Sequence, residues 1–453
     1  MICNVQWLIS EPLSFKYISD SMSYSSVKNS TFLDVVPLKT ATKNTDYQRR
    51  FHVMSKPGGS KCNLDCQYCF YLHKDELLHQ PKQPVMDDAT LEAFIKSYIE
   101  SQDGNEIVFS WQGGEPTLLG VDYFRKVVQL QQKHCPKGVK IENDLQTNGI
   151  LLNDEWCQFL KDNGFLVGLS IDGPREMHDK YRVTRSGKPT FHLVMAAVER
   201  LQDYQIPFNA LVVVNRHNVK HPLEVYRFLT KELGATYIQF TPCVEAKDFA
   251  TTAPQFWNES MTPEKGNELA KPGHPMSIVT DWSVDPDDWG YFLNTVFVEW
   301  VNNDLGRVLV NLFETAVAQV MGKESQLCVT AEFCGKGLAM EHNGDVFSCD
   351  HYVYPEYKLG NINERGLNEF AFSIRQHGFG MAKRDSLPAY CKACPYLNLC
   401  WGECPKNRLI KSPDGELGLN YLCSGIRAFF DESLPMLTGL SVLLKKQQDA
   451  LNQ

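Results

Sequence analysis

The sequence lacks a hydrophobic run long enough to cross a membrane, and it lacks a surplus of positive charge. A membrane-spanning helix needs about 20 consecutive apolar residues, and no stretch of the 453-residue chain approaches that length. The first ten residues, MICNVQWLIS, have neither the basic start nor the long apolar centre of a secretory signal. The formal net charge is −9, which argues against a protein that coats nucleic acid. We therefore predict a cytoplasmic protein that binds neither membranes nor nucleic acids.

Cysteine, in contrast, is abundant, with 15 residues in the chain. In a small secreted domain such a number would indicate disulfides. Here the count is odd, the chain is long and most of the thiols are bunched, which favours metal ligation. Four cysteines lie outside the bunches and are predicted to be small apolar residues: Cys3, Cys135, Cys157 and Cys243.

Strand-like and helix-like segments alternate from Phe51 onward, which predicts an α/β fold with a parallel sheet or a barrel. Strands are expected at 51–56, 106–111, 140–147, 165–171, 208–215 and 236–240. Helices are expected at 88–102, 121–134, 153–163, 190–204, 220–233, 286–304 and 312–322. Six strands are too few for a complete eight-stranded barrel.

Composition divides the chain into five parts. They are a polar, weakly structured extension (1–50), a barrel (51–245), a connector with helices (246–326), a cysteine-rich domain (327–430) and a C-terminal helix (431–453). The cysteine-rich part has little regular periodicity, so we expect bound metal to hold it together.

The first group of thiols, Cys62-x3-Cys66-x2-Cys69, follows the first expected strand. Three thiolates on one loop can ligate three irons of a cubane cluster and leave the fourth iron without a protein ligand. Such an open position can chelate the amine and carboxylate of a bound amino acid, as the open position of a catalytic zinc binds substrate. A zinc loop is the alternative, and it would need a fourth ligand such as His73.

Polar side chains follow the next expected strands. Gly113, Gly114 and Glu115 form a turn in which the glycines allow close backbone approach and the carboxylate can accept from an ammonium group. Ser170 and Arg182 suit a carboxylate, and Arg185 competes with Arg182 for that role. Gln146 is expected at the same mouth of the barrel.

Eight further thiols lie between residues 328 and 423, enough for two complete four-ligand sites. They are Cys328, Cys334, Cys349, Cys391, Cys394, Cys400, Cys404 and Cys423. Spacing alone cannot name the metal, so two zinc ribbons remain the alternative to two iron–sulfur clusters.

The triad, with the aromatic Tyr68 just before its last cysteine, resembles the radical S-adenosylmethionine superfamily. The resemblance implies a partial (β/α)6 barrel, a 4Fe–4S cluster and reductive cleavage of S-adenosylmethionine to a 5′-deoxyadenosyl radical. It assigns cofactor binding to Gly113, Gly114 and Glu115 (methionyl amine), Ser170 and Arg182 (methionyl carboxylate) and Tyr71 (backbone to the adenine). Tyr71 could equally be a packed aromatic.

The later thiols resemble the SPASM domain that follows some of these barrels. The resemblance implies two auxiliary 4Fe–4S clusters, three in all, with interleaved ligands. One cluster would be held by Cys328, Cys334, Cys349 and Cys404, and the other by Cys391, Cys394, Cys400 and Cys423. Both clusters would have four protein ligands, so neither would bind S-adenosylmethionine, and electron transfer is their expected role.

The segments QGGEPTL, LQTNG, FLVGLSIDGP, SCDHYV, LGNI and LNYLC, in order over about 51–430, resemble anaerobic sulfatase-maturating enzymes. That family oxidises a Ser or Cys side chain of a sulfatase to Cα-formylglycine. The resemblance implies that Asp350 is the general base, that an unfolded sulfatase segment is the substrate, and that a flavodoxin or ferredoxin donates electrons. The alternatives are a SPASM maturase of a ribosomally made peptide and a zinc-stabilised binding protein.

Overall fold

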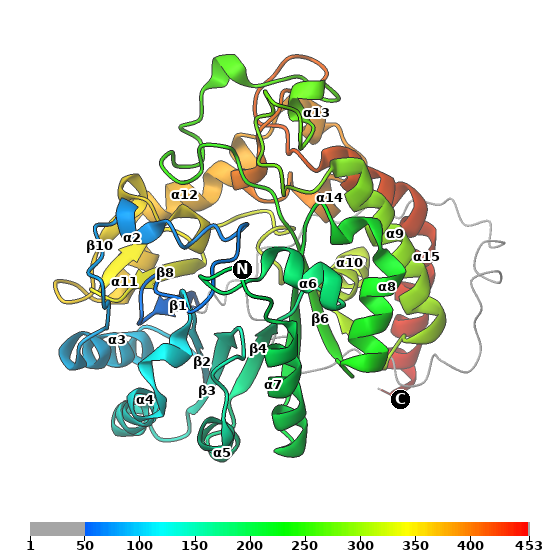
Figure 1. Cartoon of the computed structure of the whole chain (residues 1–453). Coiled ribbons are helices and arrows are strands. Elements are labelled where there is room, and N and C mark those ends of the chain that lie inside the picture. Colours follow the sequence, from blue (N-terminus) through cyan, green and yellow to red (C-terminus); the bar gives the residue numbers. More distant parts are fainter. Residues whose placement is uncertain (1–49, 452–453) are drawn as a thin grey trace.

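The computed structural model describes residues 50–451, and one sheet of ten strands runs through it (Figure 1). The strand order is β10-β9-β8-β1-β2-β3-β4-β5-β6-β7, in which β7 is the two-residue strand Leu309–Val310. The expected extension at 1–50 lies outside the described residues except for its last one. None of the helices within 50–451 is both long enough and apolar enough to span a membrane.

The first six strands are parallel neighbours in sequence order, which confirms the partial six-stranded barrel. They are β1 (His52–Lys56), β2 (Glu106–Trp111), β3 (Lys140–Thr147), β4 (Leu166–Ser170), β5 (Phe208–Val214) and β6 (Tyr237–Pro242). Because all six run in the same direction, their carboxyl ends meet at one end of the barrel, where such folds place their sites.

Helices cover the outer face of these strands (Figure 1). They are α3 (Asp88–Glu100), α4 (Val121–His134), α5 (Asp154–Asp162), α6 (Arg175–Tyr181), α7 (Phe191–Asp203) and α8 (Pro222–Arg227). The expected helix at 220–233 is not a single α-helix, because α8 changes to a π-turn at Phe228–Glu232. Side chains of Asp87 and Asn153 cap α3 and α5 by accepting from backbone N–H groups.

The cysteine-rich region continues the sheet of the barrel. Strand β8 (Gly337–Glu341) pairs in parallel with β1, and β9 (Asp345–Phe347) and β10 (Lys358–Asn361) add antiparallel strands beyond it. The register places Glu341 beside Lys56, the last residue of β1. The chain that follows β9 therefore returns to the same mouth of the barrel.

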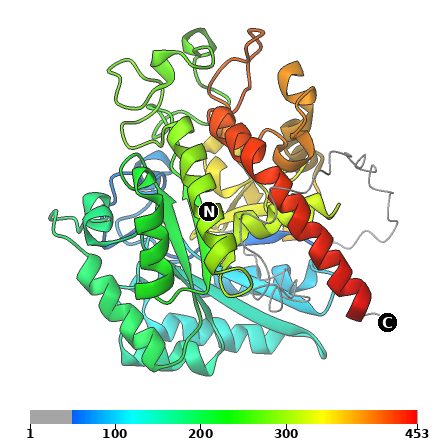
Figure 2. The same cartoon turned by 90° about the vertical axis from the view of Figure 1, so that its right-hand side faces the viewer.

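Helices between and after these strands close the other edge of the barrel. They are α9 (Pro286–Asn303), α10 (Asn311–Val320) and α15 (Cys423–Leu451), whereas α11 (Leu367–Ala371) and α12 (Ile374–Asp385) lie on the side of the cysteine-rich strands, with α11 packed against α3 (Figure 1). The last helix begins at Cys423, earlier than the expected residue 431, and it forms one long rod beside α9 (Figure 2). The backbones of α9 and α15 meet at Gly290 and Gly425, where an added Cβ on Gly425 would lie 1.9 Å from a backbone oxygen.

Candidate active site

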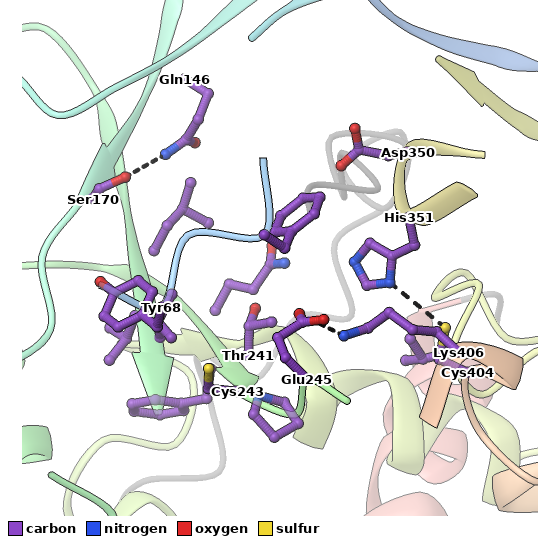
Figure 3. Close-up of a pocket in the computed structure, with 18 of the residues that line it drawn as sticks. Tyr68, Gln146, Ser170, Thr241, Cys243, Glu245, Asp350, His351, Cys404 and Lys406 are labelled. Atoms are coloured by element: carbon purple, nitrogen blue, oxygen red, sulfur yellow. Dashed lines mark hydrogen bonds and ion pairs between the residues drawn. The ribbon is translucent and has the colours of Figure 1, made fainter. Parts of the chain in front are cut away.

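A cavity of about 300 Å³ opens at the carboxyl ends of the barrel strands. Its lining extends from the first cysteine loop, across the ends of β2 to β6, to the cysteine-rich region. Figure 3 shows Tyr68, Gln146 and Ser170 on the barrel side and Asp350 and His351 on the opposite side. One cavity therefore joins residues that lie far apart in the sequence.

Cys62, Cys66 and Cys69 all line this cavity and lie close enough together for their thiols to interact electrostatically. Burial raises the pKa of the Cys62 and Cys66 thiols to about 12. Thiolates at this position therefore need a strong positive charge nearby, such as bound iron. The site fits the three-thiolate cluster expected from the sequence, and their ligation of iron stays a prediction.

The turn that carries Gly113 and Gly114 docks on the backbone of the cysteine loop. The N–H groups of Gly114 and Glu115 donate to the carbonyls of Gly59 and Lys61 at 2.9 and 2.8 Å. A Cβ at Gly114 would lie 2.1 Å from the Lys61 carbonyl oxygen. These glycines therefore approach the backbone of the loop that carries the thiols. Both glycines also line the cavity.

Glu115 is buried among donors from its own chain. Its Oε1 accepts from Thr117 and from the Thr147 hydroxyl at 2.7 Å, and its Oε2 accepts from the Asn148 N–H at 2.8 Å. A carboxylate can accept about four hydrogen bonds, and Oε2 has a single recorded donor in the described part of the chain. The role predicted for Glu115, acceptance from an ammonium group, is compatible with this arrangement.

Arg182 is held beneath the cysteine loop by two partners. Its Nη1 donates to the Tyr68 hydroxyl at 2.9 Å, the same hydroxyl donates to Asp172, and the Arg182–Asp172 distance is 3.9 Å. The buried Nε of Arg182 has no acceptor among residues 50–451. Arg182 lines the cavity, whereas Arg185 is exposed, so the geometry favours Arg182 over Arg185 as the ligand of a carboxylate.

Asp172 and Ser170 both lie near Arg182, but only Ser170 was predicted from the sequence. Asp172, two residues after Ser170, was not predicted, although a carboxylate just past a strand end is a detectable signal. Ser170 accepts from Gln146 Nε2 at 2.8 Å, so these two predicted residues do meet at the cavity.

The eight later thiols form two groups. Mutual electrostatic effects connect Cys349 with Cys404, Cys328 and Cys334, and they connect Cys423 with Cys391, Cys394 and Cys400. These are the two interleaved sets that the resemblance implies. Within residues 50–451, no three His, Cys, Asp or Glu side chains surround a point suited to a single metal ion. The donor chemistry fits two clusters, and ligation stays a prediction.

Asp350 lies at the cavity, next in sequence to Cys349. Its Oδ1 is 2.5 Å from Lys56 Nζ, and both side chains are 2% exposed. Burial by itself raises the pKa of the Asp350 carboxyl, but the paired ammonium group of Lys56 holds the net value below its ordinary range. Asp350 is therefore a carboxylate at neutral pH, as a proton acceptor must be.

Tyr71 packs between these charges. Lys56 Nζ lies 4.0 Å from the centre of its ring, and its hydroxyl donates to Glu341. Gln80 donates to the other oxygen of Glu341 at 2.9 Å. This side-chain role agrees with the packed-aromatic interpretation, and a backbone contact with adenine stays a prediction.

A buried ion pair that the sequence did not predict crosses the cavity. Lys406 Nζ lies 2.6 Å from Glu245 Oε1, and the two side chains are at most 9% exposed (Figure 3). Glu245 follows β6 and Lys406 follows Cys404, so the pair ties the barrel to the cysteine-rich region. Nothing in the local sequence of either residue indicates its partner.

Comparisons with known proteins agree with this geometry. Residues 57–229 match the Radical SAM superfamily, and residues 332–395 match the SPASM iron–sulfur cluster-binding domain. The chain is 43% identical to the serine-type anaerobic sulfatase-maturating enzyme of Bacteroides thetaiotaomicron, over 91% of this chain and 96% of the relative.

Two further comparisons concern cysteine-type enzymes and a solved structure. The chain is 32% identical to the cysteine-type anaerobic sulfatase-maturating enzyme of Clostridium perfringens, over 87% of this chain and 99% of that relative. The solved structure of native anSMEcpe with bound AdoMet and Cp18Cys peptide superimposes with a TM-score of 0.73 at 32% identity, covering 87% of this chain and 99% of that one.

Replacing Arg182 by lysine is expected to weaken the binding of S-adenosylmethionine by about tenfold. An ammonium group cannot make the two parallel hydrogen bonds that a guanidinium makes to a carboxylate. Equilibrium dialysis of the iron-loaded protein measures the effect. The exposed Arg185→Lys variant is the control and should bind like the unmodified protein, and equal weakening in both variants would contradict the assignment.

Proposed function

This chain belongs to the anaerobic sulfatase-maturating enzymes, and from that premise we propose that Asp350 is the base with which it oxidises a Ser or Cys side chain of a sulfatase to Cα-formylglycine. The observation that carries the proposal is the position of Asp350, a buried carboxylate on the cavity that lies opposite Ser170 (Figure 3) and adjoins Cys349. The chain is a radical S-adenosylmethionine enzyme by its family and its fold.

Different residues of the cavity would bind the cluster and S-adenosylmethionine. Cys62, Cys66 and Cys69 would hold the first cluster, with Glu115 and Arg182 orienting the amine and carboxylate of S-adenosylmethionine. When bound, these groups supply the radical that removes hydrogen from the substrate carbon, and the auxiliary clusters supply the acceptor for the remaining electron. The barrel and the cysteine-rich region together line the cavity.

Asp350 would accept the proton that the substrate O–H or S–H must lose as the carbonyl or thiocarbonyl forms. The carboxylate is ready for this because Lys56 keeps it ionised. Lys56 also fixes its direction, since it contacts Asp350 on one side and the Tyr71 ring on another. Asp350 directly follows Cys349, a member of the group with Cys328, Cys334 and Cys404. Consecutive Cα atoms lie about 3.8 Å apart, so the base adjoins a thiol of that auxiliary group.

Replacing Asp350 by asparagine should slow formylglycine formation about 10²- to 10⁴-fold, because an amide cannot accept the proton. Cleavage of S-adenosylmethionine should continue, since it requires no base on the cysteine-rich side. Both products can be followed by mass spectrometry in the same anaerobic reaction. Asp345→Asn, at a partly exposed aspartate paired with Lys358 on the same sheet, is the control. Full peptide turnover by the Asp350 variant would exclude it as the base.

We propose that the preferred target residue is Ser. The relative with 43% identity is a serine-type enzyme, whereas the cysteine-type relative of Clostridium perfringens is 32% identical. Two sulfatase-derived peptides that differ only in Ser or Cys at the target position should both be tested. We expect faster conversion of the Ser peptide to the aldehyde, measured by mass spectrometry. Conversion of the Cys peptide alone would overturn the preference, and a thioether cross-link without aldehyde would favour a peptide maturase instead.

We also propose that the chain carries three 4Fe–4S clusters, supported by the triad and by the two groups of four thiols. Iron analysis of the anaerobically reconstituted protein should give about 12 irons per chain. Cys400→Ala should lose about four of them. Cys157→Ala, at a buried cysteine outside all three groups, should lose none. An iron content of about four in the unmodified protein would refute the count.

The reductant is proposed to be a flavodoxin or ferredoxin, and the compartment the cytoplasm. The cysteines of the described region are all free thiols, as expected in a reducing compartment. The substrate is proposed to be an unfolded sulfatase segment, because a side chain must enter the cavity to reach the buried Asp350.

A further inference from the structure

A buried lysine outside the cavity contacts the first auxiliary group, which is Cys328, Cys334, Cys349 and Cys404. Lys383, in the last turn of α12, is 1% exposed. Its Nζ donates to the carbonyl oxygens of Cys328 at 2.7 Å, of Val329 at 2.9 Å and of Ala331. Three acceptors require three N–H donors, which an ammonium group has and a neutral amine lacks. The geometry therefore identifies Lys383 as a fully buried cation.

The hydrogen-bonding partners of this cation do not neutralise it. All three are neutral carbonyls. Glu403 is a carboxyl group that interacts electrostatically with Lys383. Burial raises the pKa of Glu403, whereas hydrogen bonds from Asn407 and Asn420 and the charge of Lys383 lower it. An ammonium buried without a paired carboxylate is costly, so its location calls for another negative charge.

The first auxiliary group, Cys328, Cys334, Cys349 and Cys404, would supply that charge when its thiolates hold a cluster. The group packs against the helix that carries Lys383, because the N–H of Cys334 donates to the carbonyl of Gly380 in α12 at 3.1 Å. The carbonyl of Cys328, a second member of the group, is a direct acceptor of the ammonium. A cubane held by four thiolates is a net anion, and it gains one more negative charge on reduction. Lys383 thus lies beside a site whose charge would change when its cluster accepts an electron.

We propose that Lys383 raises the reduction potential of the cluster held by Cys328, Cys334, Cys349 and Cys404, and so makes that cluster the acceptor of the substrate electron. The inference rests on the proposed function. In that reaction the substrate radical loses one proton, to Asp350, and one electron, to this cluster. A fixed positive charge stabilises the reduced cluster more than the oxidised cluster. Lys383 is a positioning residue and does not contact the substrate.

Two variants separate the charge of Lys383 from its hydrogen bonds. Lys383→Gln keeps N–H donors and loses the charge, whereas Lys383→Arg keeps both. Lys323→Met removes one positive charge from an exposed position and serves as the control. Each full-length protein, loaded with iron, is titrated anaerobically with dithionite and followed by electron paramagnetic resonance, with the iron content measured in parallel.

We expect one centre of Lys383→Gln to be at least about tenfold harder to reduce, which corresponds to about 59 mV for one electron. The other centres should be unchanged, and Lys383→Arg and Lys323→Met should match the unmodified protein. Unchanged potentials in fully loaded Lys383→Gln would overturn the proposal. Loss of about four irons from Lys383→Gln would also overturn it, in favour of a purely structural role for the loop contacts.

The titration contains no sulfatase peptide, so its result does not depend on whether formylglycine is the product. A shifted potential without aldehyde formation would leave the role of Lys383 intact and refute the substrate. Aldehyde formation without a shifted potential would do the reverse.

Discussion

The parallel pairing of β8 with β1 is the interaction on which the site depends. It joins the cysteine-rich region to the open edge of the barrel sheet, with Lys56 opposite Glu341. The turn after β9 then brings Cys349 and Asp350 back to the barrel mouth, where Asp350 meets Lys56. An unpaired strand edge would itself be exposed to aggregation, so one set of hydrogen bonds both protects the edge and completes the active site.

The second consequence of this pairing is that charge is buried across the cavity. Lys56–Asp350 and Lys406–Glu245 each join the barrel to the cysteine-rich region, and all four side chains are at most 9% exposed. Buried ion pairs contribute little net stability because desolvation offsets attraction. Each pair instead fixes the orientation of polar groups that line the cavity.

Local patterns were sufficient for most of the barrel. The strands at 106–111 and 140–147 and the helix at 121–134 were predicted at the bounds the structure shows, because the alternation of strand-like and helix-like segments is a local pattern. The helix at 220–233 was predicted as one α-helix and instead contains a π-turn at Phe228–Glu232. The C-terminal helix begins at Cys423, before its expected start, and the packing of Gly425 against α9 is a long-range contact that periodicity does not register.

The sequence by itself determined the cysteine groups, the strand-end motifs and the chemistry that they imply, because ligand spacing on one loop is a property of contiguous residues. Only the tertiary structure decided which distant residues act on those motifs. Asp172 behind Arg182, Lys56 beside Asp350 and Lys383 beside Cys328 are separated from their partners by 10 to 294 positions. Such pairs form because the strand order brings them together and burial then penalises any charge without a partner, and neither cause leaves a local pattern in the chain.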